Sequence, residues 1–297
     1  MFGKVFVFAP DAGTAAELCS AARGMGEKVV LATSCADSFG ADAVYSLPAD
    51  RPVPLCLGAL SELIKEVSPE LVLCGANTDG RLVAGIAAAA LGASPLCDIS
   101  SLVCEGDTLT AVRMVYGGTA FMTETCKAPA VAVVQAGAFE PAEAAGTAEA
   151  LPLPEAGAAG LELVSVAEAE ASSVNLAAAK RVVGVGRGLG SADNIPALEK
   201  LAAALGAEIG CTRPVAEEEH WYSKERYIGV SGCMLKPAFY LAVGISGQVQ
   251  HMVGVNQAGV IFAIDKNENA PIVAQADYTL VGDAATALPQ ILDKLGA

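Results

Sequence analysis

The sequence is poor in basic residues and contains only two histidines. Eighteen Lys and Arg residues stand against 33 Asp and Glu residues, which gives a formal net charge of −15 at pH 7. A chain this acidic repels the phosphate backbone of nucleic acids, and no Lys/Arg run interleaved with aromatic residues offsets the charge. We therefore expect no nucleic-acid partner.

Cysteine pairs with a metal-binding or redox spacing are also missing. The nine cysteines form no Cys-x-x-Cys pair, and neither His220 nor His251 lies at a zinc-finger spacing from a cysteine. An odd number of thiols without such pairing is typical of buried cysteines in a reducing compartment. The sequence predicts no bound metal.

No uninterrupted apolar run is long enough to cross a membrane, although 53% of the residues are hydrophobic. The longest uncharged stretch, 82–97, is rich in alanine and contains Gly and Pro, whereas a membrane helix needs roughly 20 strongly apolar residues. We expect it to form a buried helix and a turn. The first ten residues lack the long apolar core of a secretory signal. These features predict no membrane insertion and a cytoplasmic location.

Short β-branched or apolar runs alternate with segments of helical length in the first half of the chain. The runs at 4–9, 28–33 and 70–75 predict βαβ units and a parallel sheet. The runs at 109–118 and 129–136 have no long helix between them, so this end of the sheet could be antiparallel. The first domain is therefore predicted to be α/β.

Residues 137–159 are mostly Ala, Glu, Pro and Gly, a composition that cannot form much core and is typical of a linker. Residues 160–171 resume a strand-like pattern, which could return to the first sheet. We predict an N-terminal domain at 1–175 and a second domain at 176–297.

The second domain begins with an apolar run that enters the glycine-rich turn GVGRGLG at 184–190, followed by a helix ending near Leu205 with Ser191 as its cap. Further strands are predicted at 207–210, 227–230, 240–244, 260–264 and 278–281. In open α/β sheets a ligand binds beyond the carboxyl ends of the strands, so the strand ends are where we expect a site.

The glycine-rich turn supports two interpretations. Alternate glycines near a helix start let backbone amides approach a phosphate. The segment does not fit the dinucleotide pattern G-x-G-x-x-G, because Leu189 or Ser191 occupies the third glycine position. On this segment alone, nucleotide binding and a plain tight turn are equally supported.

Polar side chains follow two of the predicted strands. Residues 244–254 supply serine, glutamine and histidine directly after an apolar run, and Thr212 and Arg213 follow another strand. A lone histidine such as His251 is more often a satisfied, partly buried residue than a ligand, and an isolated arginine is usually on the surface. No Ser/His/Asp or Cys/His arrangement with a recognisable local context appears, so hydrolysis is not indicated.

Six segments, in this order, resemble the alpha subunit of electron transfer flavoproteins: GRGLGS, CTRPVAE, WYSKERYIGVSG, LKP, YLAVGISGQVQHMVG and ADYTLVGD. The third and fifth look most like the Fix branch of that family. The resemblance covers essentially the whole chain. It implies an N-terminal α/β nucleotide-hydrolase-like domain and a C-terminal Rossmann-like FAD-binding domain with a parallel sheet.

The resemblance implies an electron carrier rather than an enzyme, which binds FAD and forms a heterodimer with an electron transfer flavoprotein beta subunit. Its redox partners would be of the acyl-CoA dehydrogenase or quinone reductase type. Two alternatives stay open. One is a flavin- or nicotinamide-dependent dehydrogenase, for which no proton-transferring residue is identified, and the other is a cofactor-free assembly subunit.

The family pattern implies a role for several residues at the cofactor. Arg187 would lie near the FAD pyrophosphate, Thr212 and Arg213 near the isoalloxazine, and Ser231 at flavin N5. Residues 228–230 would line the ring with backbone. The expected FAD-binding residues are Arg187, Thr212, Arg213, Ile228, Gly229, Val230, Ser231, Ser246, Gly247, Gln248, Val249, Gln250, His251, Asp265, Asp277 and Tyr278.

Charge near the flavin ring would set its reduction potential. Reduction places negative charge on the N1/O2 edge of the ring, so a nearby cation or hydrogen-bond donor stabilises the reduced forms. The resemblance places His251 on the O2 side, and Arg213 and His251 would then raise the potential. Asp277 and Tyr278 would lie at the adenosine end.

Asp265 departs from the family pattern, in which an AINKD-like motif places Asn where this chain reads AIDKN. An ionised Asp only accepts hydrogen bonds and would repel a pyrophosphate at short range. We expect Asp265 to accept from a ribityl or ribose hydroxyl, with Asn267 supplying the lost donor. Pairing with Lys266 or Arg187, a weakened site, or a loop turned away from FAD are the alternatives.

Overall fold

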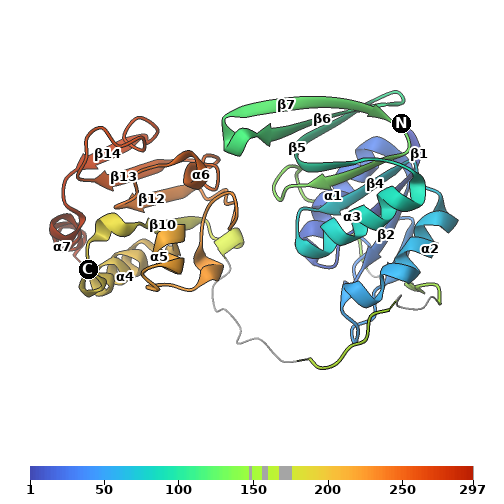
Figure 1. Ribbon diagram of the computed structural model, residues 1–297, viewed down its shortest axis with the longest axis horizontal. Coiled ribbons are helices and arrows are strands. Elements are labelled where there is room, and N and C mark those ends of the chain that lie inside the picture. Colours follow the sequence, from blue (N-terminus) through green and yellow to red (C-terminus); the bar gives the residue numbers. More distant parts are fainter. Residues whose placement is uncertain (147–148, 156–159, 167–175, 297) are drawn as a thin grey trace. The chain divides into compact units, whose positions relative to one another are not determined.

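The computed structural model describes residues 1–146, 149–155, 160–166 and 176–296 (Figure 1). The chain divides into two compact units, one formed by 1–116 with 120–167 and the other by 117–119 with 168–297. The boundary that the sequence predicts, between 175 and 176, falls at the edge of 167–175, which lies outside the described residues, and stays a prediction. No helix of the described residues is long and apolar enough to cross a bilayer.

The first unit contains one nine-stranded sheet in the order β7-β6-β5-β8-β4-β1-β2-β3-β9. In this order every neighbouring pair from β5 to β9 is parallel, whereas β6 pairs antiparallel with both β5 and β7. The α/β prediction and its antiparallel end are therefore confirmed. The strands are β1 (Phe2–Phe8), β2 (Gly26–Thr33), β3 (Ala43–Ser46), β4 (Leu71–Gly75), β5 (Pro95–Glu105), β6 (Thr108–Val115), β7 (Ala120–Lys127), β8 (Ala130–Val134) and β9 (Leu151–Pro152).

Helices on both faces bury the parallel strands. Helix α1 (Ala12–Met25) packs on one face, and α2 (Leu57–Val67) and α3 (Thr78–Leu91) pack on the other. All five residues of β4 are buried, as expected for a parallel strand covered on both sides. Side chains cap two of the helices, because Asp11 accepts from the Thr14 N–H at 2.9 Å and Asn77 from the Gly80 N–H at 2.7 Å.

The segment predicted as a linker is attached to the first unit. The Glu17 carboxylate accepts from the N–H groups of Gly137 and Phe139, both at 3.0 Å, and the short strand β9 pairs with β3. Phe139 and Leu153 also pack against the two cores of the unit, but the segment has few other large apolar residues, which is why its composition suggested a linker. The strand expected at 160–171 is wrong for 160–166, which form none, and 167–171 lie outside the described residues.

The second unit contains a five-stranded parallel sheet in the order β11-β10-β12-β13-β14. Its strands are β10 (Arg181–Val185), β11 (Glu208–Cys211), β12 (Phe239–Val243), β13 (Ile261–Asp265) and β14 (Tyr278–Val281), and its helices are α4 (Ile195–Leu205), α5 (Arg213–Glu217), α6 (Val249–Met252) and α7 (Ala284–Leu295). This is a doubly wound order, and the direction of winding reverses between β10 and β12. A ligand site is therefore expected beyond the carboxyl ends of these two strands.

Local chemistry explains the boundaries in this unit. Ser191 accepts from the Asp193 N–H and caps the 3₁₀ turn that leads into α4, whereas the N-cap of α4 itself is Asn194, so the predicted cap lies one turn before the helix. The strand predicted at 227–230 is wrong: Tyr227 and Ile228 form only isolated bridges, and Gly229 has φ 140°.

Across both units, short 3₁₀ turns lie at Val53–Leu55, Tyr116–Gly118, Leu176–Ala178, Arg187–Leu189, Ala192–Asn194 and Lys224–Arg226.

Candidate functional site

A cavity of about 720 Å³ lies at the reversal point of the second unit, beyond the carboxyl ends of β10 and β12. This volume is within the range of about 300–1,000 Å³ that small-molecule and cofactor sites occupy. Eleven of the sixteen residues expected to bind FAD line it. The lining residues are Gly186, Arg187, Gly188, Thr212, Arg213, Pro214, Tyr227, Ile228, Val230, Ser231, Gly244, Ile245, Ser246, Gln248, Gln250, His251 and Asp265.

Glycines let the turn after β10 lie directly against the turn after β12. The Gly188 N–H donates to the Gly244 carbonyl at 2.9 Å, and a Cβ at Gly188 would lie 2.6 Å from the Gly244 Cα. Gly244 itself has φ 64°, in the left-handed region that favours glycine. Gly186 and Gly188 of GVGRGLG therefore serve close backbone packing against Gly244 at the cavity wall, which the spacing alone did not reveal.

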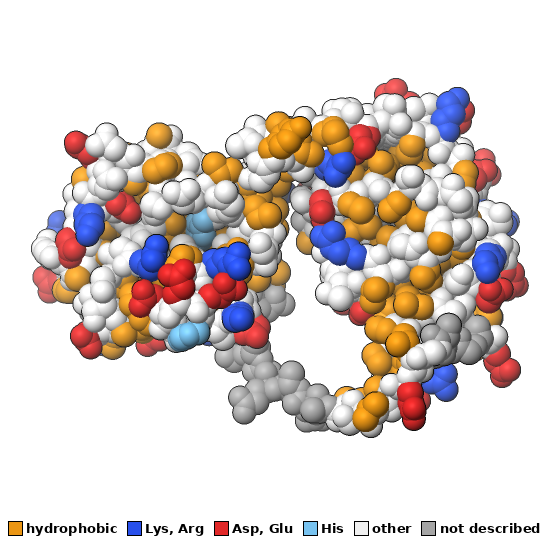
Figure 2. Space-filling view, viewed as in Figure 1, with side chains coloured by type: hydrophobic (Ala, Val, Ile, Leu, Met, Phe, Trp, Pro, Cys, Tyr) orange, Lys and Arg blue, Asp and Glu red, His pale blue; other side chains and the backbone are white. Residues whose placement is uncertain are grey.

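Two arginines bring positive charge to the cavity, and each is paired with a glutamate. The Arg213 Nε lies 2.7 Å from Glu217 Oε2, and the Arg187 Nη1 lies 3.3 Å from Glu218 Oε2. The hydrogen bond from Arg213 lowers the pKa of the Glu217 carboxyl below its usual range. Lys and Arg side chains lie beside Asp and Glu side chains on this unit in Figure 2. Both arginine side chains are about 60% exposed, so an anionic ligand can reach them.

His251 is held on the protein side by two hydrogen bonds. Its Nε2 lies 2.8 Å from the Tyr240 hydroxyl and its Nδ1 lies 3.2 Å from the Ile228 carbonyl oxygen. The residue is only 7% exposed, and burial lowers the pKa of the imidazole to about 4. Both ring nitrogens of His251 therefore have a protein partner, and burial favours the neutral imidazole, as the residues alone indicated; its place on the O2 side of the flavin stays a prediction.

The loop that follows β11 and α5 supplies backbone and a hydroxyl to the cavity. Val230 N–H donates to the Gln250 carbonyl at 2.9 Å, which ties this loop to α6. Gly229 lies between two lining residues, and a Cβ there would lie 2.6 Å from the Gln250 oxygen. Ser231 is exposed beside them. Gly247 and Val249 alternate with lining residues in the same way and do not line the cavity themselves.

Asp265 ends β13 and lines the cavity, so the loop does not turn away from it. Its Oδ1 accepts from the Asn267 N–H at 2.8 Å, which orients the carboxylate at the start of the loop. Arg187 pairs with Glu218 instead of Asp265. The remaining oxygen of Asp265 is an acceptor only, and it suits a hydroxyl group better than a phosphate.

Asp277 and Tyr278 are not brought to the cavity. Asp277 accepts from the Ile261 N–H at 2.8 Å, and Tyr278 stacks on Phe262 with ring centroids 4.6 Å apart. Both contacts lie where β13 and β14 begin, at the amino ends of the strands and away from the cavity at their carboxyl ends. Gly282 and Asp283 follow the carboxyl end of β14, and Asp283 caps α7 by accepting from the Thr286 N–H. Asp283 rather than Asp277 or Tyr278 is the residue of the segment ADYTLVGD that follows a strand end, and the contact of Asp277 and Tyr278 with the adenosine stays a prediction.

Sequence reasoning also missed six lining residues. Each follows a strand of the sheet or lies in the loop at 227–231, and the segments that carry the family resemblance contain all of them. The rule that ligands bind at the carboxyl ends of strands could have found them. They are Gly186, Gly188, Pro214, Tyr227, Gly244 and Ile245.

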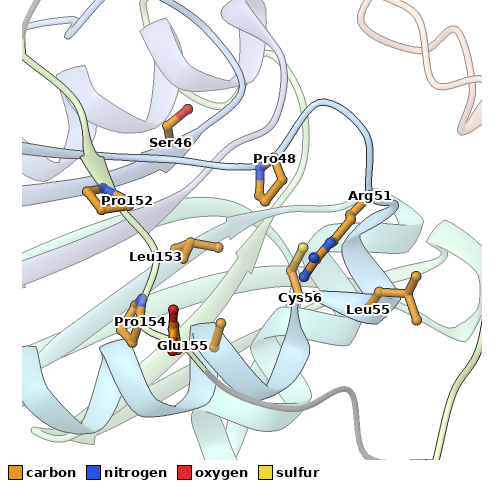
Figure 3. Close-up of a pocket in the computed structure, with 10 residues that line it drawn as sticks. Ser46, Pro48, Arg51, Leu55, Cys56, Pro152, Leu153, Pro154 and Glu155 are labelled. Atoms are coloured by element: carbon orange, nitrogen blue, oxygen red, sulfur yellow. The ribbon is translucent and has the colours of Figure 1, made fainter.

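A second cavity, of about 630 Å³, lies in the first unit between the end of β3 and the start of α2 (Figure 3). Arg51 and Glu155 are its charged side chains, and Pro48, Leu55 and Leu153 are among the apolar ones. Few polar groups converge there, so we assign the functional site to the second unit. Within the described residues, no group of three or more His, Cys, Asp or Glu side chains could hold a metal ion.

Known proteins resemble this chain over nearly its full length. Residues 13–171 match the family described as electron transfer flavoprotein domain, and residues 175–256 match the electron transfer flavoprotein FAD-binding domain. Protein FixB of Salmonella typhimurium is 40% identical over 307 residues, which cover 98% of this chain and 97% of that protein. Protein FixB of Escherichia coli O17:K52:H18 is 39% identical over 304 residues, with the same coverage.

One solved structure, of a putative thiamin diphosphate-dependent enzyme from Mycobacterium smegmatis, covers 98% of this chain and 59% of its own. Its TM-score is 0.24 at 11% sequence identity, so it supports no argument about this protein.

Proposed function

This chain belongs to the electron transfer flavoprotein alpha-subunit family, and we propose that it binds FAD in the cavity between β10 and β12 and carries electrons from a dehydrogenase to an acceptor as one half of an alpha/beta heterodimer. Its family consists of electron transfer flavoprotein subunits rather than catalytic enzymes, and the FAD-binding domain is the part matched at 175–256. When bound, FAD supplies the redox chemistry.

The observation that carries the proposal is the agreement between the cavity and the matched domain. Of the lining residues, all except Asp265 lie between 186 and 251, inside the range matched to the FAD-binding domain. The cavity has the properties that FAD needs: close backbone turns, two accessible arginines and several exposed polar side chains. Ser231, Ser246 and Gln248 are exposed there and free to turn toward a ligand.

We assign roles from the chemistry of the lining residues. Arg187 and Arg213 would offset the negative charges of the pyrophosphate and of the reduced ring, respectively. Thr212, Ser231 and the backbone at 228–230 would contact the ring. Asp265 would accept from a sugar hydroxyl. Asp277 and Tyr278 are left out of the proposed site because they lie at the other edge of the sheet.

The proposal also includes the proteins with which this chain assembles and exchanges electrons. The family supports a beta subunit, and an acyl-CoA dehydrogenase or quinone reductase would serve as the redox partner. We also propose a cytoplasmic location, which is supported by the nine free cysteines.

Purification of the chain with its beta subunit tests the function. The complex is expected to be yellow and to exchange electrons with a reduced dehydrogenase. On denaturation it should release one FAD for each copy of this chain, in addition to any flavin that the beta subunit holds. Arg187→Ala with Arg213→Ala should lower the FAD content, whereas Arg51→Ala in the cavity of Figure 3 should not. A colourless complex that stays apo in excess FAD would refute the proposal.

A further inference from the structure

A short helix beside the cavity carries one of the two cavity arginines at its start and a glutamate at its end. Arg213 begins α5 and Glu217 ends it, and the Arg213 Nε donates to Glu217 Oε2 at 2.7 Å. Residues four positions apart lie on the same face of a helix, one turn from each other. Arg213 lines the cavity, whereas Glu217 does not. Glu217 can therefore act on a ligand only through Arg213 or through its charge.

The core of the second unit fixes the backbone of α5. Val215 is completely buried and Ala216 is 3% exposed, and both pack into this core. The Trp221 N–H donates to the Val215 carbonyl at 3.2 Å, which ties the segment after the helix back to it. Because the helix is anchored in this way, the side chains of Arg213 and Glu217 meet across one turn of fixed position.

Helix stability does not explain this ion pair. Exposed pairs at this spacing stabilise a helix only slightly, and the favourable order places the acid before the base. In α5 the base comes first. Arg213 lies at the N-terminal end of the helix, which favours anions, and Glu217 lies at the C-terminal end, which favours cations. The pair is therefore better explained by what it does to the cavity arginine.

The pairing leaves most of the Arg213 guanidinium available to a ligand. An arginine has five N–H donors, one on Nε and two on each Nη. Glu217 occupies the Nε donor, and among the residues that the structure describes neither Nη of Arg213 has an acceptor. Since the guanidinium is planar, holding Nε restricts the directions in which the four remaining donors point.

The pairing also changes the charge that the cavity receives. The hydrogen bond from Arg213 lowers the pKa of the Glu217 carboxyl, and the charges of Arg213 and Lys224 lower it further, against a smaller opposing effect of desolvation. Glu217 is therefore ionised at neutral pH and offsets part of the Arg213 charge at short range. A cation beside a flavin ring stabilises its reduced form, so this offset lowers the reduction potential.

We propose that Glu217 is a positioning residue of the flavin site, which orients Arg213 through its Nε and limits how far the guanidinium raises the flavin reduction potential. The flavin part rests on the proposed function, whereas the orientation of Arg213 is a property of this chain alone. The next acid, Glu218, serves the other cavity arginine, Arg187, at 3.3 Å. The two successive glutamates therefore have separate partners.

Reduction potentials of the FAD-loaded alpha/beta complex test the proposal. Glu217→Gln keeps an oxygen that accepts from Nε but carries no charge, so the ratio of reduced to oxidised FAD at a fixed potential should rise about threefold. Glu217→Ala also releases Arg213, so its ratio should be lower than that of Glu217→Gln. Glu219→Gln is the matched control and should leave the ratio unchanged, because Glu219 is exposed and lies beyond the end of α5.

The same variants in an Arg213→Ala background show whether Glu217 acts through the arginine. In that background Glu217→Gln and Glu217→Ala should give equal ratios of reduced to oxidised FAD. Equal ratios for these two variants while Arg213 is present would overturn the positioning role. A ratio in Glu217→Gln that matches the wild type would overturn the effect on the potential.

Nitrogen NMR of the ¹⁵N-arginine-labelled full chain tests the orientation without FAD. The Nε–H signal of Arg213, identified by its absence in Arg213→Ala, should exchange slowly with water in the wild type. Glu217→Ala should lose this protection, and Glu217→Gln should lie between the two. Equal exchange in all three proteins would refute the orientation of Arg213 by Glu217. If the wild-type complex binds no FAD, the proposed function fails while the NMR result stands by itself.

Discussion

Lowering the pH should destabilise the second unit through His251. The pKa of the buried imidazole is about 4, below the ordinary value of 6.5, so the folded chain keeps the ring neutral while the unfolded chain takes up a proton below pH 6.5. Stability is therefore present in full above pH 6.5 and is lost as the pH falls toward 4. At 1.36 kcal/mol per pH unit below pH 6.5, and with the folded ring starting to protonate near pH 4.5, the loss between pH 7 and 4.5 amounts to about 2 kcal/mol.

The assay is urea denaturation followed by the fluorescence of Trp221, the single tryptophan, which packs against the core of the second unit. His251→Gln keeps a donor and an acceptor but cannot titrate, so the difference from wild type isolates the histidine from the carboxylates. That difference should shrink by about 2 kcal/mol from pH 7 to 4.5. His220→Asn, at an exposed position, should show no such change. A pH-independent difference between wild type and His251→Gln would refute the reasoning.

Further predictions concern the cofactor and the partner. Arg213→Ala should lower the flavin reduction potential, less so at high salt, whereas Arg181→Ala, at the amino end of β10, should leave it unchanged; a redox titration that shows equal shifts would exclude the role. Asp265→Asn should weaken FAD binding in equilibrium dialysis if the carboxylate accepts from a hydroxyl, and marked tightening would mean that it repels the cofactor. Gly188→Ala should reduce both stability and FAD content, because its Cβ would lie 2.6 Å from the Gly244 Cα; normal FAD content would show that the turn can adapt. The chain expressed without a beta subunit should lose FAD or self-associate, and size-exclusion chromatography showing a flavin-retaining monomer would argue against the heterodimer.

In the first unit, sequence patterns predicted the buried strands β1, β2, β4 and β8 and missed β7. The strands β1, β2, β4 and β8 are continuous apolar runs, since helices cover both faces of that part of the sheet. The strand β7 alternates between half-buried and exposed residues and carries Thr, Glu and Lys, so its composition did not stand out. Residues 227–230 look like a strand because they are apolar, but Gly229 and the contacts to α6 make them a loop at the cavity.

The site shows a similar division. The family resemblance located the cavity through segments that lie after β10, β11 and β12, and a ligand at these strand ends follows from topology. It could not show the direction of side chains. His251 points to Tyr240 and Ile228 rather than outward, a contact between residues 11 and 23 positions apart. Nor could it show that each cavity arginine already has a glutamate partner from the region of α5.

A crystal structure of the alpha/beta complex with FAD tests the central claim most directly. The account predicts one FAD beyond the carboxyl ends of β10 and β12, with its pyrophosphate at Arg187 and its isoalloxazine between Arg213 and the loop at 228–231. His251 should still bond Tyr240 and Ile228 in that structure. FAD bound in the cavity of Figure 3, at the edge formed by Asp277 and Tyr278, or on the beta subunit alone would contradict it.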